Sequence, residues 1–172
     1  MQQQIVAQFI QADHQRRFEH TRERREPRSQ AYAELIAQTQ SVGTLISSMH
    51  HSQSYTQDDV RAALEEIIKV LRARARVMVE GPGDVADSTE DIVGTITACR
   101  HRLMALASIP GAPPELQAMP REELIEQCGD GLGTLEEALE TFVEAARQAL
   151  DADGVNHHSD SLLRAVQASA LG

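Results

Sequence analysis

The sequence predicts an all-α protein, an antiparallel up-down-up-down four-helix bundle with an extended N-terminal helix. Three observations support this fold class. Ala, Leu, Gln, Glu and Arg dominate the composition, and helices prefer these residues. In four segments apolar residues recur at alternating spacings of three and four, as they do in packed helices. Short stretches that contain Pro, Gly or capping residues separate these segments, so neighbouring helices are expected to run in opposite directions.

The chain begins with a predicted helical arm, residues 1–26. Its one apolar cluster lies near the start, and from there Arg and Glu are interleaved, with six Arg against four acids over residues 1–28, a net charge of about +2. A helix without an apolar face is either solvated or docked on a partner. A frayed terminus that lies over the bundle is the alternative. The candidate interaction residues of the arm are Ile5, Val6, Phe9, Ile10, Arg16, Arg17, Arg24 and Arg25.

The predicted bundle covers residues 27–154, and its first helix carries a regular apolar seam. Pro27 either kinks the chain or starts a new helix, because proline lacks an amide proton and crowds the preceding turn. Whether the arm continues straight through Pro27 is left open by the sequence. The seam that follows consists of Tyr32, Leu35, Thr39, Val42, Ile46 and Met49.

The second helix is expected over residues 57–80. Thr56 is a favourable N-cap, with Asp58 and Asp59 in the first turn, where the helix dipole favours anions. Gly81-Pro82-Gly83 ends the helix. The seam predicted to face the core is Val60, Leu64, Ile67, Leu71, Ala75 (or Arg74) and Met78.

The third helix is expected over residues 83–108 and has the most regular period in the chain. Its N-terminal turns are acidic, and a proline-rich loop follows it from Ile109. Its predicted seam is Val85, Thr89, Ile92, Ile96, Cys99, Leu103 and Leu106.

The fourth helix is expected to start near Pro120 and to end at residues 151–154, before a tail, residues 155–172, with a short helix. Three glycines inside it should each weaken the helix by about 1 kcal/mol relative to Ala. We interpret the run from Gly129 to Gly133 as a closely packed turn rather than a phosphate loop, since no strand precedes it. The predicted seam is Ile125, Cys128, Leu132, Leu135, Leu139, Phe142, Ala146 and Ala149.

Charge and composition exclude several classes of function. The formal net charge is −10, which argues against a whole-protein nucleic-acid binder. Three Phe, two Tyr and no Trp leave few platforms for base stacking. The order of charges at the start does not resemble a signal peptide, and no apolar run is long enough for a membrane span. We therefore expect a cytoplasmic protein without a membrane span.

The sequence contains no recognisable catalytic constellation, and we expect neither enzymatic activity nor a cofactor. The seven His lack the spacing of helical metal sites, so no metal site is predicted. Cys99 and Cys128 both fall on core seams, at similar heights if their helices are antiparallel. Two interpretations follow, a redox-sensitive thiol pair or two small buried thiols that fill the core, and the second is favoured.

Three stretches together resemble a known group of proteins. They are Arg28-Ser-Gln-Ala-Tyr-Ala-Glu-Leu after the Arg-rich segment, Val77-Met-Val-Glu-Gly-Pro-Gly-Asp-Val-Ala-Asp, and Phe142-Val-Glu-Ala-Ala-Arg-Gln-Ala-Leu. The order resembles uncharacterised helical-bundle proteins of Streptomyces and related actinobacteria. Many of those carry a membrane helix before the Arg-rich segment, and this chain carries a short apolar cluster there. The resemblance covers about residues 16–150 and implies no activity and no site residues.

The leading hypothesis is a non-enzymatic cytoplasmic helical bundle that acts through protein–protein contact. The undocked arm favours a homodimer formed through the N-terminal helix, or contact with another helical protein. One alternative is a small-ligand-binding or sequestering bundle with a pocket between helices, because methionines such as Met49, Met78 and Met104 tolerate irregular pockets. The other alternative is weak nucleic-acid binding by the Arg-rich arm.

Overall fold

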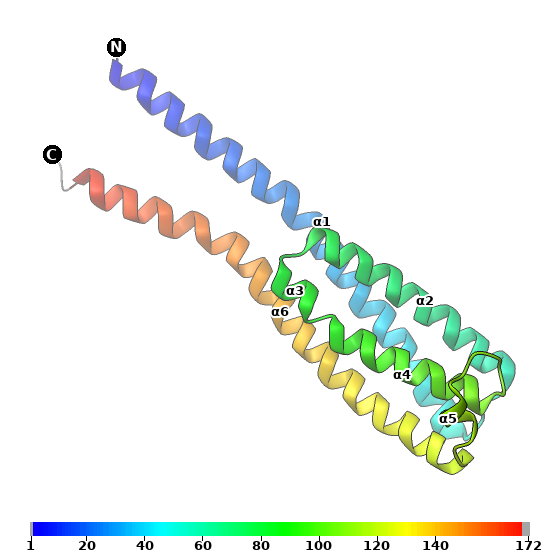
Figure 1. The fold of residues 1–172 in the computed structure, drawn as a ribbon. Coiled ribbons are helices and arrows are strands. Elements are labelled where there is room, and N and C mark those ends of the chain that lie inside the picture. Colours follow the sequence, from blue (N-terminus) through cyan, green and yellow to red (C-terminus); the bar gives the residue numbers. More distant parts are fainter. Residues whose placement is uncertain (1, 170–172) are drawn as a thin grey trace.

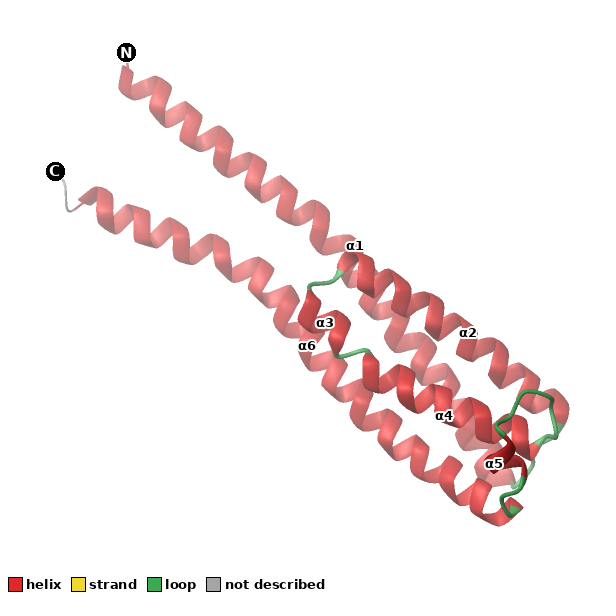
Figure 2. Cartoon of the chain, viewed as in Figure 1, coloured by secondary structure: helices red, strands yellow, loops and turns green. Residues whose placement is uncertain are grey.

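The structure is a computed structural model that describes the backbone of residues 2–169 and the side chains of residues 25–152. Every regular element in this range is a helix, which confirms the predicted all-α class (Figure 2). The helices are α1 (Gln2–Ser52), α2 (Gln57–Glu80), α3 (Gly83–Asp87), α4 (Glu90–Leu106), α5 (Pro114–Gln117) and α6 (Arg121–Ser169).

The long helices α1, α2, α4 and α6 lie side by side in a helical bundle (Figure 1). α1 packs extensively against α2 and α6, and α4 packs extensively against α6, whereas α2 and α4 share a much smaller contact. α1 and α6 run in opposite directions, and both continue past the same end of the bundle. The loop that contains α5 lies at the other end.

α1 passes through Pro27 as one continuous helix. A proline in a helix interior costs about 3 kcal/mol, because a backbone hydrogen bond is lost and the ring crowds the preceding turn. Tertiary contacts follow directly after it. Arg28 Nε donates to the carbonyl oxygen of Glu80 at 2.7 Å, and Ala31 and Tyr32 are buried. Arg28 thereby pairs a carbonyl at the C-terminus of α2 that has no partner within its own helix.

The core contains the predicted seams of α1 and of α3–α4 and part of the predicted seam of α6. All six predicted residues of the α1 seam and all seven of the α3–α4 seam are buried. On α6 the prediction holds for half of the seam, since Cys128, Leu135, Phe142 and Ala146 are buried. Up to residue 152 of α6, two buried residues lie outside the predicted seam, Leu124 and Ala138. Four predicted residues are only half-buried, Ile125, Leu132, Leu139 and Ala149.

The cap predicted at the start of α2 is present. Thr56 Oγ1 accepts a hydrogen bond from the backbone N–H of Asp59 at 3.2 Å and donates to the carboxylate of Asp59 at 2.6 Å. The pair satisfies one of the amides that the first helical turn leaves without partners. It explains why α2 begins at Gln57, as expected.

The predicted single helix over residues 83–108 is wrong, because the chain forms α3 and α4 with a break at Ser88 and Thr89. Ser88 Oγ donates to the carbonyl oxygen of Val85 at 2.8 Å, and Thr89 Oγ1 donates to that of Ala86 at 2.6 Å. Serine and threonine hydroxyls compete in this way with the backbone bonds of a helix. Arg74 Nε of α2 donates to Thr89 Oγ1 at 3.0 Å and so ties the break to the neighbouring helix.

α6 does not end at residues 151–154, as the pattern predicted, but continues to Ser169. The terminal parts of the chain belong to the same helices as the bundle, α1 and α6. The predicted division into arm, bundle and tail stays a prediction. None of the described helices combines the length and apolar character that crossing a membrane requires.

Candidate functional site

α2 carries a row of apolar side chains on its solvent side. The row consists of Leu64, Ile68, Leu71, Ala75 and Met78, hereafter the outer stripe, and its members are spaced by four, three, four and three residues. Ile68, Leu71 and Met78 are 48%, 39% and 53% exposed, and Ala75 is also exposed. Leu64 is half-buried and packs against the core, so the exposed part of the stripe runs from Ile68 to Met78.

The seam that the sequence assigned to the core shares Leu64, Leu71, Ala75 and Met78 with the outer stripe, and this assignment is wrong for Leu71, Ala75 and Met78, which are exposed. The predicted Val60 and Ile67 are buried, and the face of α2 that points inward consists of Val60, Ala63, Ile67, Val70, Ala73 and Val77. α2 therefore has two apolar faces. The smaller side chains face the core because α1 packs closely against this helix.

The spacing of the outer stripe is the one used where helices pack on one another. Single exposed apolar residues are common on protein surfaces, but contiguous apolar patches mark interaction sites. Alternating spacings of four and three keep such residues on one line along a helix, which a second helix covers. Val79, which is 80% exposed, widens the apolar surface at the C-terminal end of the stripe.

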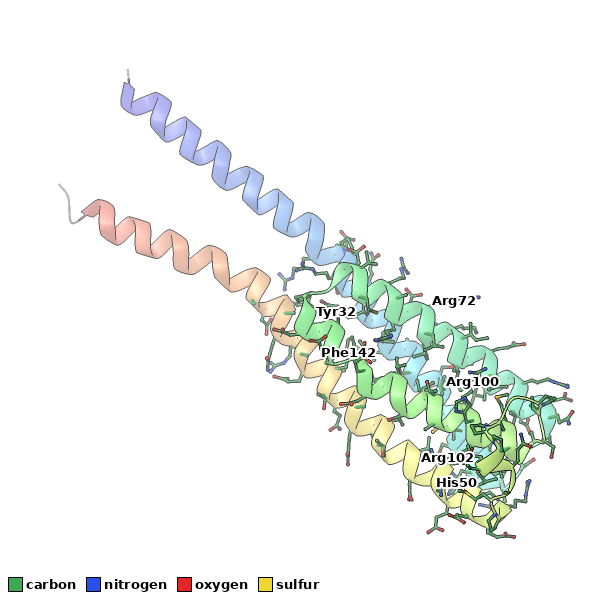
Figure 3. The ribbon with its side chains drawn as sticks, in the orientation of Figure 1. Tyr32, His50, Arg72, Arg100, Arg102 and Phe142 are labelled. Carbon is green, nitrogen blue, oxygen red and sulfur yellow. The ribbon has the colours of Figure 1, made fainter. Side chains whose placement is uncertain are left out.

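Charged residues flank the outer stripe on one side. Glu65 and Arg72 are seven residues apart on this flank, and neither pairs with another residue among the described side chains. Arg72 lies on the outer side of α2 (Figure 3). Other basic groups of α2 are already paired, since Arg74 binds Glu90 and Arg76 binds Glu34. Glu65 and Arg72 are therefore available to a second molecule.

The predicted residues of the arm fall almost entirely outside the described side chains. Residues 2–24 belong to the helical backbone of α1, and the side chains of Ile5, Val6, Phe9, Ile10, Arg16, Arg17 and Arg24 are outside the described part. Arg25 is described and is exposed.

Both cysteines lie buried between α4 and α6. An added Cβ at Gly131 would lie 2.7 Å from Cys99 Sγ, so the absence of a side chain at Gly131 lets the two helices approach here. Arg102 Nε donates to Gln127 Oε1 at 3.0 Å and closes the interface on its outer side. Cys99 and Cys128 are both free thiols.

Burial determines the protonation of these thiols. The pKa of Cys128 is raised to about 12, mainly by burial and also by the neighbouring Cys99, whereas Arg102 opposes the rise. Burial also raises the pKa of Cys99 above its ordinary value, against the opposing effect of Arg102. The thiolate is the nucleophile and the metal ligand, so both cysteines are poor at either role near neutral pH. The redox-sensitive pair stays a prediction.

A cluster of His50, Tyr55 and Arg121 lies at the end of the bundle where α1 turns into α2 and α6 begins. The Tyr55 hydroxyl lies 3.4 Å from His50 Nδ1, and the Arg121 guanidinium lies 5.9 Å from the centre of the Tyr55 ring. Burial raises the pKa of Tyr55 to about 12, with Cys128 adding to the rise and Arg121 opposing it. An added Cβ at Gly129 would lie 2.8 Å from the His50 ring, so Gly129 also permits close packing. The cluster holds the α1–α2 turn against the start of α6.

Among the side chains that the structure describes, no three His, Cys, Asp or Glu residues lie where they could share a metal ion. Comparisons of the chain with protein-family models, with curated proteins and with solved structures find no match. The outer stripe is thus the feature of the described surface that most directly indicates a function.

Proposed function

We propose that this protein is a non-enzymatic helical bundle that acts through protein–protein contact, and that it self-associates through the outer stripe of α2. The observation that carries the proposal is the exposure of Ile68, Leu71 and Met78 along one line of a helix. Burying one Leu, Ile or Met side chain contributes about 1.5–3 kcal/mol, so covering this row gives a substantial driving force.

The charges beside the outer stripe support a second copy of the same chain as the partner. In an antiparallel pair of α2 helices, Ile68 of one copy faces Leu71 of the other. Glu65 and Arg72 lie on the same flank of the stripe, so this arrangement places Glu65 of each copy beside Arg72 of the other. A two-fold axis produces this pairing twice, and opposite charges at such flanking positions set the orientation of paired helices.

The N-terminal arm is proposed as a further contact of the same dimer. α1 continues from the bundle to Gln2, beyond the end of α2 (Figure 1). The sequence of the arm supplies the apolar cluster from Ile5 to Ile10 for such a contact. We also propose an up-down-up-down order for α1, α2, α4 and α6, supported by the opposite directions of α1 and α6, and a cytoplasmic location. Binding of nucleic acid by the arm remains the alternative.

The test is the mass of the protein in solution, measured by light scattering during size-exclusion chromatography. The full chain should be dimeric, and Ile68→Glu should make it monomeric, because a carboxylate at the centre of the stripe would be buried without a partner. Val143→Glu on α6 is the matched control, since Val143 is 40% exposed and lies off the stripe. It should leave the dimer intact.

Two results would contradict the proposal. One is a full chain that is monomeric at every concentration at which it stays soluble. The other is an equal loss of the dimer in Ile68→Glu and Val143→Glu. A chain that starts at Pro27 separates the contribution of the arm, since a dimer held by the outer stripe alone survives this truncation.

A further inference from the structure

α1 and α6 enclose a cleft of about 590 Å³ on a different side of the bundle from the outer stripe. Clefts of roughly 300–1,000 Å³ hold small organic molecules in proteins. The α1 wall carries neutral hydrogen-bonding side chains around Gly43, and the α6 wall carries leucines and one acid. The two walls therefore differ in chemistry, and the cleft is amphipathic.

Thr39 lines this cleft with a buried hydroxyl. Its residue is 1% exposed, and its Oγ1 has no hydrogen-bond partner among the described residues. Thr44, one turn further along the same wall, behaves differently and donates to the carbonyl oxygen of Gln40 at 2.9 Å. Buried hydroxyls in proteins are almost always paired, because an unmade hydrogen bond costs free energy. The Thr39 hydroxyl could therefore form a hydrogen bond with a ligand in the cleft.

The opposite wall is a row of leucines. Leu132, Leu135 and Leu139 follow one another at spacings of three and four on α6, over about 10 Å of helix. Leu135 is buried, and the other two are half-buried at the edge of the cleft. A flat apolar body one or two rings long matches this wall in length.

The charge around the cleft is negative. Among the described residues that line it, Glu136 alone is ionisable, and its side chain is exposed. Neither wall supplies a base nearby, since residues 29–49 and residues 122–146 contain no Lys, Arg or His. A cation is therefore attracted to this cleft and an anion is repelled.

We propose that the cleft between α1 and α6 binds a small organic amine with an apolar body of one or two rings. The leucine row covers the rings, the Glu136 carboxylate pairs with the protonated amine at the open side, and the Thr39 hydroxyl bonds a polar atom of the ligand inside. The site does not depend on the outer stripe, so a monomeric chain binds equally well.

Dansylcadaverine, a fluorescent two-ring amine, is a suitable probe. Binding should raise its fluorescence and shift its emission to the blue, with one site per chain. Gly43→Leu should abolish this signal, because a Cβ at Gly43 meets no atom within 4 Å and a larger side chain grows into the cleft. Gly133→Leu is the matched control, since a Cβ at Gly133 also meets no atom within 4 Å and Gly133 does not line the cleft.

Two further variants test the assigned roles. Glu136→Gln should weaken binding by about two- to fivefold, since an ion pair with an exposed carboxylate contributes at most about 1 kcal/mol. Thr39→Val keeps the shape of the side chain without the hydroxyl, so it should raise the melting temperature of the free protein and weaken binding of the amine. A melting curve by circular dichroism shows that each variant is folded.

The proposal is overturned if dansylcadaverine does not bind the full chain, or if Gly43→Leu and Gly133→Leu bind it equally. It is also overturned if the anionic dye anilinonaphthalene sulfonate binds as tightly as the amine, since the charge argument then fails. Ile68→Glu should bind the amine like the unaltered chain. Loss of binding in Ile68→Glu would place the probe on the outer stripe and would likewise overturn it.

Discussion

Tyr32 of α1 and Phe142 of α6 meet edge to face, with ring centroids 5.9 Å apart and planes at 90° (Figure 3). The two rings are 2% and 0% exposed, and they close the core at the end where both helices leave the bundle. Edge-to-face pairs contribute about 0.5–1.5 kcal/mol beyond the burial of the rings.

Phe142→Ala should lower the free energy of unfolding by about 3–5 kcal/mol, because it removes the largest fully buried side chain and leaves a cavity. Urea unfolding followed by circular dichroism measures the change. Val143→Ala, at the adjacent exposed position, should change it by less than about 0.5 kcal/mol. Similar losses in the two variants would contradict the assignment of Phe142 to the core.

Two neighbouring isoleucines test which face of α2 is buried. Ile67 is 1% exposed and Ile68 is 48% exposed. Ile67→Ala should cost about 2–5 kcal/mol of unfolding free energy in urea, whereas Ile68→Ala should cost about 1 kcal/mol or less in the monomer. Ile68→Ala should instead weaken self-association. The reverse order of stabilities would contradict the burial of Ile67, which the sequence pattern also predicts.

Two glycines of α6 should respond to alanine in opposite directions. Gly133→Ala should stabilise the protein by about 1 kcal/mol, since alanine is the better helix former and the added Cβ meets no atom within 4 Å. Gly131→Ala should destabilise it by about 1–3 kcal/mol, because its Cβ would lie 2.7 Å from Cys99 Sγ.

A double-mutant cycle in thermal or urea unfolding isolates this contact. Combining Gly131→Ala with Cys99→Ala should cost less than the sum of the two single changes, because the sulfur that collides with the new methyl group is gone. Strict additivity would show that Cys99 is not the reason why position 131 excludes a larger side chain.

The buried thiols should make the protein less stable in base. The unfolded chain loses the Cys128 proton near the ordinary pKa of 9.0, whereas the folded chain keeps it to about 12. Over this window the folded state binds more protons, so the free energy of unfolding falls as pH rises, by about 1.4 kcal/mol per pH unit for one such group. Tyr55 adds to the fall above its ordinary pKa of 10.0.

Urea unfolding at pH 8, 9, 10 and 11 measures the slope, and Cys128→Val should make it shallower. Below pH 9 the two proteins should show the same pH dependence, because the thiol is protonated in both states there. An equally steep slope in Cys128→Val would mean that other groups cause the loss of stability.

The sequence predicts the helices of this protein well where only one face is apolar. Tyr32, Val42 and Ile46 fall on the single apolar line of α1, and all three are buried. The pattern fails on α2, where two lines are apolar. The larger side chains Leu71 and Met78 define the more obvious seam, yet Val70 and Val77 face the core, because the closeness of α1 favours smaller residues. The spacing of apolar residues along a helix does not indicate how closely a neighbouring helix packs against it.

The candidate sites could not be predicted from the sequence either, because they depend on how neighbouring helices are placed. The break at Thr89 depends on a hydroxyl that bonds the carbonyl of Ala86 and on Arg74 from another helix. Thr39 is correctly predicted as a seam residue, but its lack of a partner emerges only when α1 and α6 are placed side by side. A weak signal existed for the outer stripe, since α2 has more apolar positions than one buried face requires.

α1 and α6 leave the bundle at the same end, and this geometry has a mechanical consequence. A force that draws their outer segments apart acts across the α1–α6 interface rather than along it (Figure 1). The contacts then bear the load one after another, beginning at the end of the interface where Tyr32 and Phe142 meet, instead of sharing it. The interface between the two helices would therefore separate progressively at low force, while the opposite end, with Tyr55 and the α5 loop, would stay closed.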